Sequence, residues 1–193
     1  AQRNFTDPDS HIMPAPGGKE FLQAYNCQAA VDSVHQVIVA AEATNHPSDK
    51  TQALPMMKEI ESNTGSVPKE VSADAGYFSA SAIEGLTALG VNPFIPPDKT
   101  RHGRVVPSAP RGRIPRHLSP SDRMRRKLRT KRGRKRYALR MGTVEPVFGQ
   151  IKQGRGFRQF LLRGLDNVNS EWQLICTGHN LLKLFASAQK TPA

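Results

Sequence analysis

Positive charge is concentrated in one segment of this 193-residue chain, and that segment limits what the chain can fold into. Residues 99–140 carry 17 basic side chains and 1 acidic one, whereas residues 1–98 carry 5 basic and 12 acidic ones. Ten of the fourteen residues from 123 to 136 are Lys or Arg. Like charges at this density repel one another unless a polyanion neutralises them, so the segment predicts a nucleic-acid partner rather than a merely solvated helix face.

The remainder of the chain has the composition of an ordinary globular body. It contains no apolar run of 18 residues, which argues against a membrane protein. Residues 1–18 lack the apolar core of a signal peptide, so a cytoplasmic protein is expected. Cys27 and Cys176 each lie in a largely apolar run, which predicts buried free thiols.

Strands and helices are expected to alternate in the first half of the chain. Apolar runs on both sides of Asp32 predict a hairpin, and residues 37–39 predict a strand buried on both faces. A helix is expected around residues 54–60, with Ser48 or Asp49 as its N-cap.

A second helix is expected over residues 79–89, with Gly90 closing it. Short strands are expected over residues 70–73 and 91–95, the latter at a sheet edge because it contains Pro93. The pattern predicts an α/β fold with a mixed sheet, in which the hairpin supplies the antiparallel part.

The second half divides into a connector and two helical regions. Proline and arginine dominate residues 99–120, which predicts an extended connector between an α/β part at residues 1–98 and a helical part at residues 121–193. A basic helix is expected from about Ser119 onward, and a packing helix over residues 169–188 in which His179 is a satisfied core histidine.

Several acidic residues are candidates for chemistry. Asp74 follows a predicted strand and precedes a small-residue turn, as active-site carboxylates of open α/β sheets do, although a turn-forming aspartate has the same pattern. Glu145 lies in an apolar stretch, as either a functional carboxylate or the first-turn residue of a helix starting near Pro146. Asp7 and Asp9 are consistent with a turn or with a metal site, and the sequence favours the turn.

Four short motifs, in this order, resemble bacterial insertion-sequence transposases of the DDE class. They are Asn-Phe-Thr-Asp-Pro-Asp-Ser at residues 4–10, Tyr-Asn-Cys-Gln-Ala-Ala-Val-Asp at 25–32, Ala-Asp-Ala-Gly-Tyr at 73–77, and Val-Glu-Pro-Val-Phe-Gly-Gln-Ile-Lys at 144–152. The sequences at residues 155–158 and 160–165 match what typically follows. The resemblance implies a ribonuclease H-like fold, a mixed five-stranded sheet with flanking helices, here interrupted by the basic insertion.

The resemblance also assigns roles to individual residues. Asp74 and Glu145 correspond to two catalytic, metal-binding carboxylates of the family. Tyr137, Arg140, Glu145 and Lys152 match its Tyr-Arg-Glu-Lys signature, although one more residue separates Arg140 from Glu145 than is common in related groups. DNA-binding roles are implied for Tyr137, Arg140, Lys152, Arg155 and Arg158.

The chemistry that the resemblance implies fits these residue types. Two Mg²⁺ or Mn²⁺ ions about 3.5–4 Å apart would activate the attacking oxygen and stabilise the leaving oxygen of a phosphodiester. Such ions prefer hard carboxylate ligands. The implied partner is double-stranded DNA, both transposon ends and target, acted on by a homodimer associated with the bacterial nucleoid.

The main departure from the family is at the front of the chain. The family's first catalytic aspartate usually lies in an Asp-Gly-Thr-like motif on the first strand, and no Asp-Gly-Thr occurs here. We therefore expect the catalytic domain to be incomplete at its N-terminus, with replacement by Asp7 or Asp9 as the alternative. A non-catalytic nucleic-acid-binding remnant of a decayed transposase, and a basic structural protein of RNA complexes, are the rival interpretations.

Overall fold

The chain folds into two compact units, which are described separately. The computed structural model describes residues 4–15, 20–99, 107–109, 111–115 and 117–189, so parts of the predicted connector lie outside the described residues. One unit, the terminal unit, comprises residues 1–47 and 143–193, and the other, the central unit, comprises residues 48–142. The division of the chain at residues 98 and 120, made on composition, stays a prediction.

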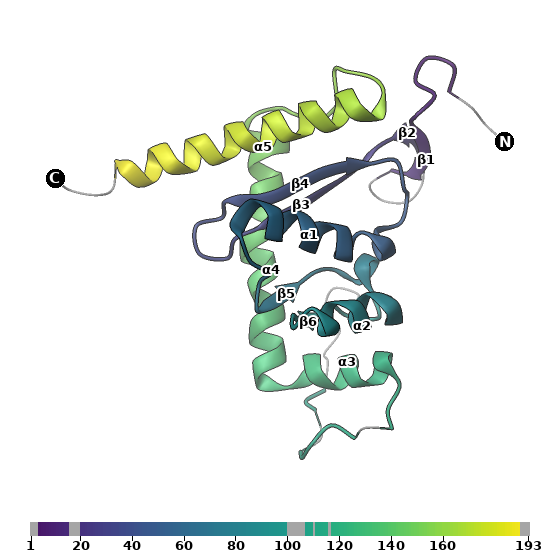
Figure 1. The fold of residues 1–193 in the computed structure, drawn as a ribbon, viewed down its shortest axis with the longest axis vertical. Helices are drawn as coiled ribbons and strands as arrows, with labels where there is room; N and C mark the ends of the chain where they lie inside the picture. The colour runs from purple at the N-terminus through teal and green to yellow at the C-terminus, as the bar shows by residue number, and fades with distance from the viewer. Residues whose placement is uncertain (1–3, 16–19, 100–106, 110, 116, 190–193) are drawn as a thin grey trace. The chain divides into compact units, whose positions relative to one another are not determined.

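Two antiparallel strand pairs form the sheets of the terminal unit (Figure 1). They are β1 (His11–Pro14) with β2 (Phe21–Ala24), and β3 (Asn26–Val31) with β4 (Ile38–Thr44). The second pair is the predicted hairpin. No position of β4 is exposed, although Val39 and Glu42 are only partly buried, so the expected burial on both faces holds for most of the strand.

Helix α5 (Leu165–Ala188) packs against β4 and closes the core of the terminal unit (Figure 1). It begins four residues before the predicted start. The buried residues of this core are Ile38, Ala41, Ala43, Val147, Ile151, Val168, Trp172, Ile175 and Cys176. The small alanine side chains at alternate positions of β4 let a helix that carries a tryptophan approach the strand closely. The Trp172 Nε1 donates a hydrogen bond of 2.9 Å to the Gln28 carbonyl, so its one polar atom is satisfied.

Two asparagines of α5 bind the backbone of β4. The Asn180 amide accepts from the Ile38 N–H and donates to the Ile38 carbonyl, both at 2.8 Å, in the manner of a neighbouring strand. The Asn169 Oδ1 accepts from the Ala43 N–H at 2.9 Å. These bonds satisfy backbone groups of β4 that its partner β3 does not reach, which explains polar residues on a packed helix face.

The Thr-Asp-Pro-Asp-Ser motif fixes the beginning of α5. Asp7 is buried, and its Oδ1 accepts from the Tyr25 hydroxyl at 2.7 Å and from the Gly164 N–H at 3.1 Å. The Asp9 Oδ2 accepts from the Leu165 N–H at 3.0 Å. Negative charge at a helix N-terminus is favourable, so both aspartates have a structural role.

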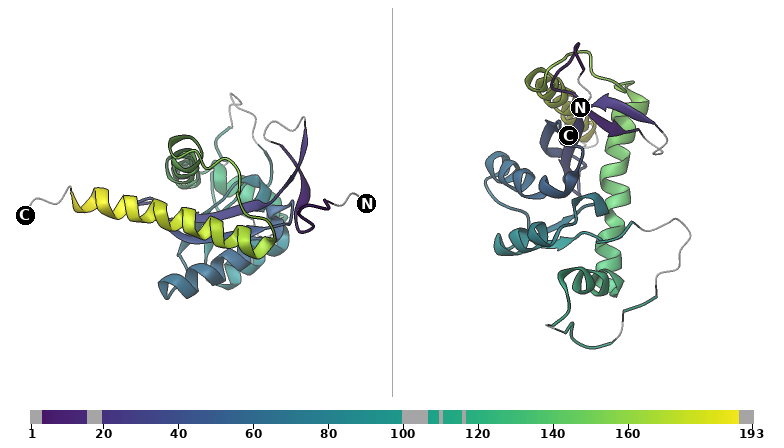
Figure 2. Two further views of the ribbon diagram at one scale, coloured as in Figure 1. Left: turned by 90° about the horizontal axis from the view of Figure 1, so that it is seen from above. Right: turned by 90° about the vertical axis from the view of Figure 1, so that its right-hand side faces the viewer.

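The central unit contains a β-α-β element and a second helix beside it (Figures 1 and 2). Strand β5 (Glu70–Ser72) pairs in parallel with β6 (Asn92–Phe94), and α2 (Ala80–Ala88) connects them. Helix α1 (Ala53–Thr64) lies against α2, and a Cβ on Gly85 would come within 2.7 Å of the Leu54 side chain, which would then have to move.

Local signals set most of the boundaries in the central unit. The Ser79 side chain caps α2, and Gly90 follows it with the predicted left-handed φ of 77°. The N-cap prediction for α1 was wrong by a few residues. Ser48 caps a 3₁₀ turn, Asp49–Thr51, and Gln52 precedes α1.

The predicted basic helix is two helices. Helix α3 (Pro120–Arg129) has Ser119 as N-cap and Pro120 in its first turn, as expected, but ends at Thr130, whose backbone is extended. Helix α4 (Lys131–Gly149) then begins, and a π-helical segment, Gln150–Gly154, follows it. Of the two interpretations of Glu145, that of a first-turn residue in a helix starting near Pro146 is wrong, because Pro146 lies inside α4.

The α/β class is confirmed, whereas the ribonuclease H-like arrangement is not. Within the described residues the six strands pair as three two-stranded sheets instead of one mixed sheet. Among the helices described, none combines the length and apolarity that crossing a membrane requires.

The partly buried hydrogen bond between Asp7 and Tyr25 predicts a measurable coupling in the terminal unit. We expect Asp7→Asn and Tyr25→Phe each to lower the free energy of unfolding by about 1–3 kcal/mol, because each leaves a partner less well satisfied. The double variant should cost at least about 0.5 kcal/mol less than the sum of the single ones. Urea denaturation measures all four proteins.

Asp166→Asn is the matched control, since Asp166 is an exposed acid in the first turn of the same helix. It should change the free energy of unfolding by less than about 0.5 kcal/mol. Simple additivity of Asp7→Asn and Tyr25→Phe would contradict the structural role of the motif.

Candidate nucleic-acid and metal site

Asp74 caps a turn directly after β5. Its Oδ1 accepts a 2.8 Å hydrogen bond from the Gly76 N–H, at the start of a 3₁₀ turn (Ala75–Tyr77), and the side chain is exposed. The turn-forming interpretation of this aspartate is therefore confirmed. The hydrogen bond from Gly76 engages only the Oδ1 of Asp74, and the Oδ2 belongs to a side chain that is exposed to solvent.

A second carboxylate, Asp49, lies beside Asp74. A Cβ placed on Gly76 would lie 2.7 Å from the Asp49 Oδ2 and 2.9 Å from the Asp74 Oδ1, so a larger residue there would force both carboxylates to move. Burial, followed by the charges of these two acids, raises the pKa of the Tyr77 hydroxyl. From the sequence, Asp49 was predicted only as a helix cap. The signal that another side chain approaches Asp74 closely was Gly76 of the Asp-Ala-Gly-Tyr motif.

Glu145 is exposed on α4 and belongs to the terminal unit, whereas Asp74 belongs to the central unit. In the part of the chain that the structure describes, no three His, Cys, Asp or Glu side chains gather as a metal-binding group.

The implied DNA-binding residues of the central unit lie together on α4. The Arg140 guanidinium carbon is 5.7 Å from the centre of the Tyr137 ring, within the range of a cation–π contact. Both side chains are partly buried. The predicted signature thus holds its first two members in mutual contact one helical turn apart.

Lys152 is exposed in the π-helical segment of the terminal unit. Its ammonium group lies 5.4 Å from the centre of the Phe148 ring, which in turn stacks on Trp172 at 5.9 Å between ring centres. The lysine is therefore anchored to the core through an aromatic ring. The Arg158 guanidinium donates to the side chain of Gln153, which follows Lys152 in the same segment.

Arg155 is positioned by the buried histidine of α5. Its Nη1 lies 3.2 Å from the His179 Nδ1, and the His179 Nε2 lies 3.0 Å from the Gln36 carbonyl. A guanidinium can only donate and a carbonyl can only accept, so the imidazole is neutral with its proton on Nε2. His179 is therefore the satisfied core histidine that was predicted, and it also orients a candidate DNA-binding residue.

Both cysteines are thiols, as expected; Cys176 is buried, whereas Cys27 is only partly buried instead of fully buried. Burial raises the pKa of the Cys27 thiol to about 12, so it stays protonated at neutral pH. A nucleophilic role for Cys27 is thereby disfavoured.

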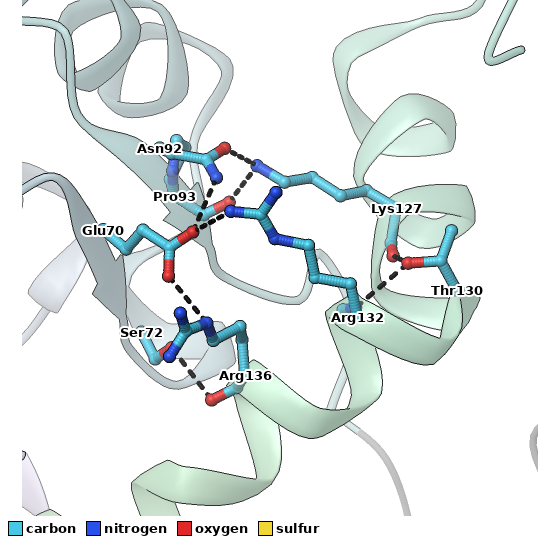
Figure 3. A network of polar contacts seen from close by, with 9 residues as sticks. Glu70, Ser72, Asn92, Pro93, Lys127, Thr130, Arg132 and Arg136 are labelled. Atoms are coloured by element: carbon cyan, nitrogen blue, oxygen red, sulfur yellow. Dashed lines mark hydrogen bonds and ion pairs between the residues drawn. The ribbon is translucent and has the colours of Figure 1, made fainter.

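The basic helices of the central unit have both internal partners and exposed charge. Arg125 forms ion pairs with Asp98 and Asp122, at 2.6 and 2.8 Å. Arg126 and Arg129 donate to backbone carbonyls of the connector, from residues 111–113 and 107–108 respectively. Figure 3 shows a further cluster, in which Arg132 and Arg136 converge on Glu70. Part of the basic run therefore stabilises the unit itself.

Comparison with known proteins supports the resemblance recognised in the sequence. Residues 102–185 match a family model described as "Transposase DDE domain", consistent with a DDE transposase. The matched range contains Tyr137, Arg140, Glu145 and Lys152. No curated protein and no solved structure is significantly similar to the chain.

The buried His179 predicts that the terminal unit loses stability in acid. Burial lowers the pKa of His179, and the neighbouring cations Arg155 and Lys183 oppose its protonation further. The unfolded chain therefore binds a proton that the folded chain does not, and the free energy of unfolding should fall as the pH decreases from about 7 to about 5.

Urea denaturation at the two pH values measures this effect in the parent chain and in His179→Gln. The stability difference between them should shrink in acid, because the variant has no group to protonate there. His35→Gln is the control, since His35 is exposed in the β3–β4 turn. An equal pH dependence in the parent and His179→Gln would rule out a neutral, buried imidazole.

Proposed function

We propose that this chain is the catalytic part of a DDE-class DNA transposase, from the match of residues 102–185 to the transposase DDE domain. That match carries the proposal, because it covers the Tyr-Arg-Glu-Lys signature. The reaction proposed is metal-dependent phosphodiester cleavage and strand transfer at insertion-sequence ends. Two copies are proposed to act together on the DNA.

In this proposal Asp74 and Glu145 hold divalent metal ions, Mg²⁺ or Mn²⁺. Both side chains are exposed carboxylates, which are the hard oxygen donors that these ions prefer. The ions would stabilise charge on the attacking and leaving oxygens. Asp74 contributes a carboxylate whose orientation the Gly76 N–H fixes, and Glu145 contributes one from a helix.

The cationic residues that flank Glu145 in the sequence would bind the DNA backbone. Arg140 and Lys152 contact aromatic rings, and Arg155 contacts a buried imidazole. The charged group of each residue is therefore held in place by a neighbouring ring. Arg and Lys contacts to phosphate position DNA without reading its sequence. Arg158 and Tyr137 complete the proposed DNA-binding set.

A ribonuclease H-like sheet is part of the same proposal. The antiparallel β3–β4 pair and the parallel β5–β6 pair supply strands of both directions, as a mixed sheet needs. The family's first strand carries its first aspartate. We therefore expect the third carboxylate of the site to come from a strand other than these four.

Substituting the two proposed metal ligands should abolish cleavage and spare DNA binding. In a transposase preparation that cuts its DNA ends with Mg²⁺, Asp74→Asn and Glu145→Gln should each lower the rate by about 100-fold or more, since metal ions supply several kcal/mol of transition-state stabilisation. Gel-based cleavage and binding assays measure both activities.

Glu84→Gln is the matched control, because Glu84 is an exposed helical acid outside the proposed site. Its cleavage rate should stay close to that of the parent. If Asp74→Asn and Glu145→Gln cleave normally, the carboxylate assignment is wrong. If no cleavage is found in any preparation while DNA is bound, the decayed, non-catalytic interpretation is favoured instead.

The 193-residue chain by itself should bind duplex DNA without cutting it. Neutralising about 6–10 phosphates makes the affinity fall by about 10³–10⁵ between about 50 and 200 mM salt. Cutting is not expected, because Asp7 and Asp9 are engaged at the start of α5. Mg²⁺-dependent nicking that Asp7→Ala or Asp9→Ala abolishes would overturn this expectation.

A further inference from the structure

An open pocket in the central unit is lined by cations that the family signature does not include. It has a volume of about 460 Å³, and its lining residues are Lys69, Glu70, Asn92, Arg132 and Arg136. Three of these side chains are cationic and one is anionic, so the pocket carries a net positive charge at neutral pH. Its surroundings are the basic helices α3 and α4.

Glu70 aligns the two arginines at the base of this pocket (Figure 3). It accepts from the Arg132 Nη2 and, at 2.8 Å, from the Arg136 Nε. The hydrogen bond from Arg132 and the charge of Arg136 lower the pKa of Glu70, which keeps its carboxylate ionised. The Glu70 side chain is 23% exposed, whereas those of Arg136 and Arg132 are 47% and 71% exposed.

The arginines therefore present donors to solvent above a recessed carboxylate. A guanidinium has five N–H donors in a rigid fork. Glu70 engages one nitrogen of each, which leaves further donors of both groups for an incoming anion. Arg132 and Arg136 are four residues apart on α4, so they project from the same face of the helix.

The base of the pocket is held rigidly. The Asn92 Nδ2 donates to Glu70 at 3.3 Å, and the Asn92 Oδ1 accepts from the Lys127 ammonium at 2.6 Å. Lys127 also donates to the Pro93 carbonyl and lies 4.5 Å from the centre of the Phe94 ring. These bonds fix the strand, the asparagine and the end of α3 in one network.

Gly133 brings α4 close to the end of α3. A Cβ on Gly133 would lie 2.0 Å from the Lys127 carbonyl oxygen, which no other residue would permit without a backbone shift. Arg132 and Arg136 lie on either side of this glycine in the sequence of α4 and reach Glu70 at the start of β5. The pocket is therefore built by glycine, asparagine and carboxylate positions as well as by the cations.

We infer that this pocket binds a backbone phosphate of duplex DNA through Arg132, Arg136 and Lys69, with Glu70 as the positioning residue for the two guanidinium groups. The inference rests on the proposed function for its ligand. A planar guanidinium can bind two phosphate oxygens at once, which an ammonium cannot. The site adds a phosphate contact in the central unit to the signature residues.

Charge-conserving variants separate this pocket from the general field of the basic helices. The parent, Arg132→Lys/Arg136→Lys and Arg123→Lys/Arg134→Lys are compared by fluorescence anisotropy on a short duplex. All three proteins carry the same net charge, and Arg123 and Arg134 are exposed arginines outside the pocket lining. We expect the pocket pair to bind about tenfold more weakly, and the control pair to stay within about twofold of the parent.

Equal affinities of the two double variants would overturn the assignment of the pocket as a phosphate site, although DNA binding by the parent would still support the proposed function. Failure of the parent to bind DNA would count against the proposed function itself. Lys69→Ala leaves the Glu70 ion pairs in place, so it serves if the double variant fails to fold. Lys69→Ala should lower the magnitude of the slope of log affinity against log salt concentration by about one. An unchanged slope would contradict a phosphate contact of Lys69 in the pocket.

A titration followed by NMR distinguishes DNA from free phosphate as the ligand. The Asn92 side-chain amide reports on the pocket, because its Nδ2 donates to Glu70. We expect this resonance to shift with duplex DNA at concentrations at least about 100-fold below those needed with inorganic phosphate, since neighbouring phosphate contacts add to the affinity. A shift at equal concentrations would overturn the assignment to a DNA backbone.

Discussion

Repulsion among the basic side chains of α3 and α4 is the constraint on which the central unit depends. Ten Lys and Arg residues occur between positions 123 and 136, and they lie on α3 and on the first part of α4. The fold compensates for this charge locally. Asp98 and Asp122 pair with Arg125, backbone carbonyls of the connector accept from Arg126 and Arg129, and Glu70 pairs with two arginines of α4.

This compensation divides the basic run into two functional groups. The arginines with internal partners hold the connector and the strands against the helices. Exposed cations such as Arg123, Arg134 and Lys135 are directed to solvent. Arg132 and Arg136 belong to both groups, because each pairs with a recessed carboxylate while much of its side chain remains exposed. A solvated helix face and a polyanion-binding surface are therefore combined on the same helices.

The elements that were predicted correctly are those with strong local signals. Ser79 and Gly90 bound α2, and Pro120 with Ser119 begins α3, because caps and proline act within one turn of the chain. The break at Thr130 was missed although Thr130 is itself a capping residue, whose hydroxyl accepts from the Gly133 N–H at 3.0 Å at the start of α4. The sequence shows Gly133 but not the Lys127 carbonyl that it approaches. Pro146 indicated a helix start, yet α4 continues through it.

Long-range contacts explain what sequence reasoning did not find. The bonds of Asn169 and Asn180 to β4 join residues more than 120 positions apart, and periodicity carries no trace of them. Glu70 was not found either, because it belongs to no recognised motif. Asp49 was not found as a neighbour of Asp74, because the two residues come together only on folding. The candidate residues themselves were found through the motifs. Their immediate surroundings, including the aromatic rings beneath Arg140 and Lys152, required the structure.

The geometry at Asp74 shows that its two interpretations are compatible. The sequence is consistent with a turn-forming aspartate or with a functional one, and one residue can have both roles. The hydrogen bond from the Gly76 N–H engages one carboxylate oxygen and fixes the side chain in an exposed position. A ligand that must meet a metal ion with small positional error benefits from such a restraint. Because Gly76 also admits the Asp49 carboxylate at close range, any residue with a Cβ there would displace both acids. The Asp-Ala-Gly-Tyr motif is thus explained by sterics, and the same sterics would hold Asp74 ready for the chemistry proposed.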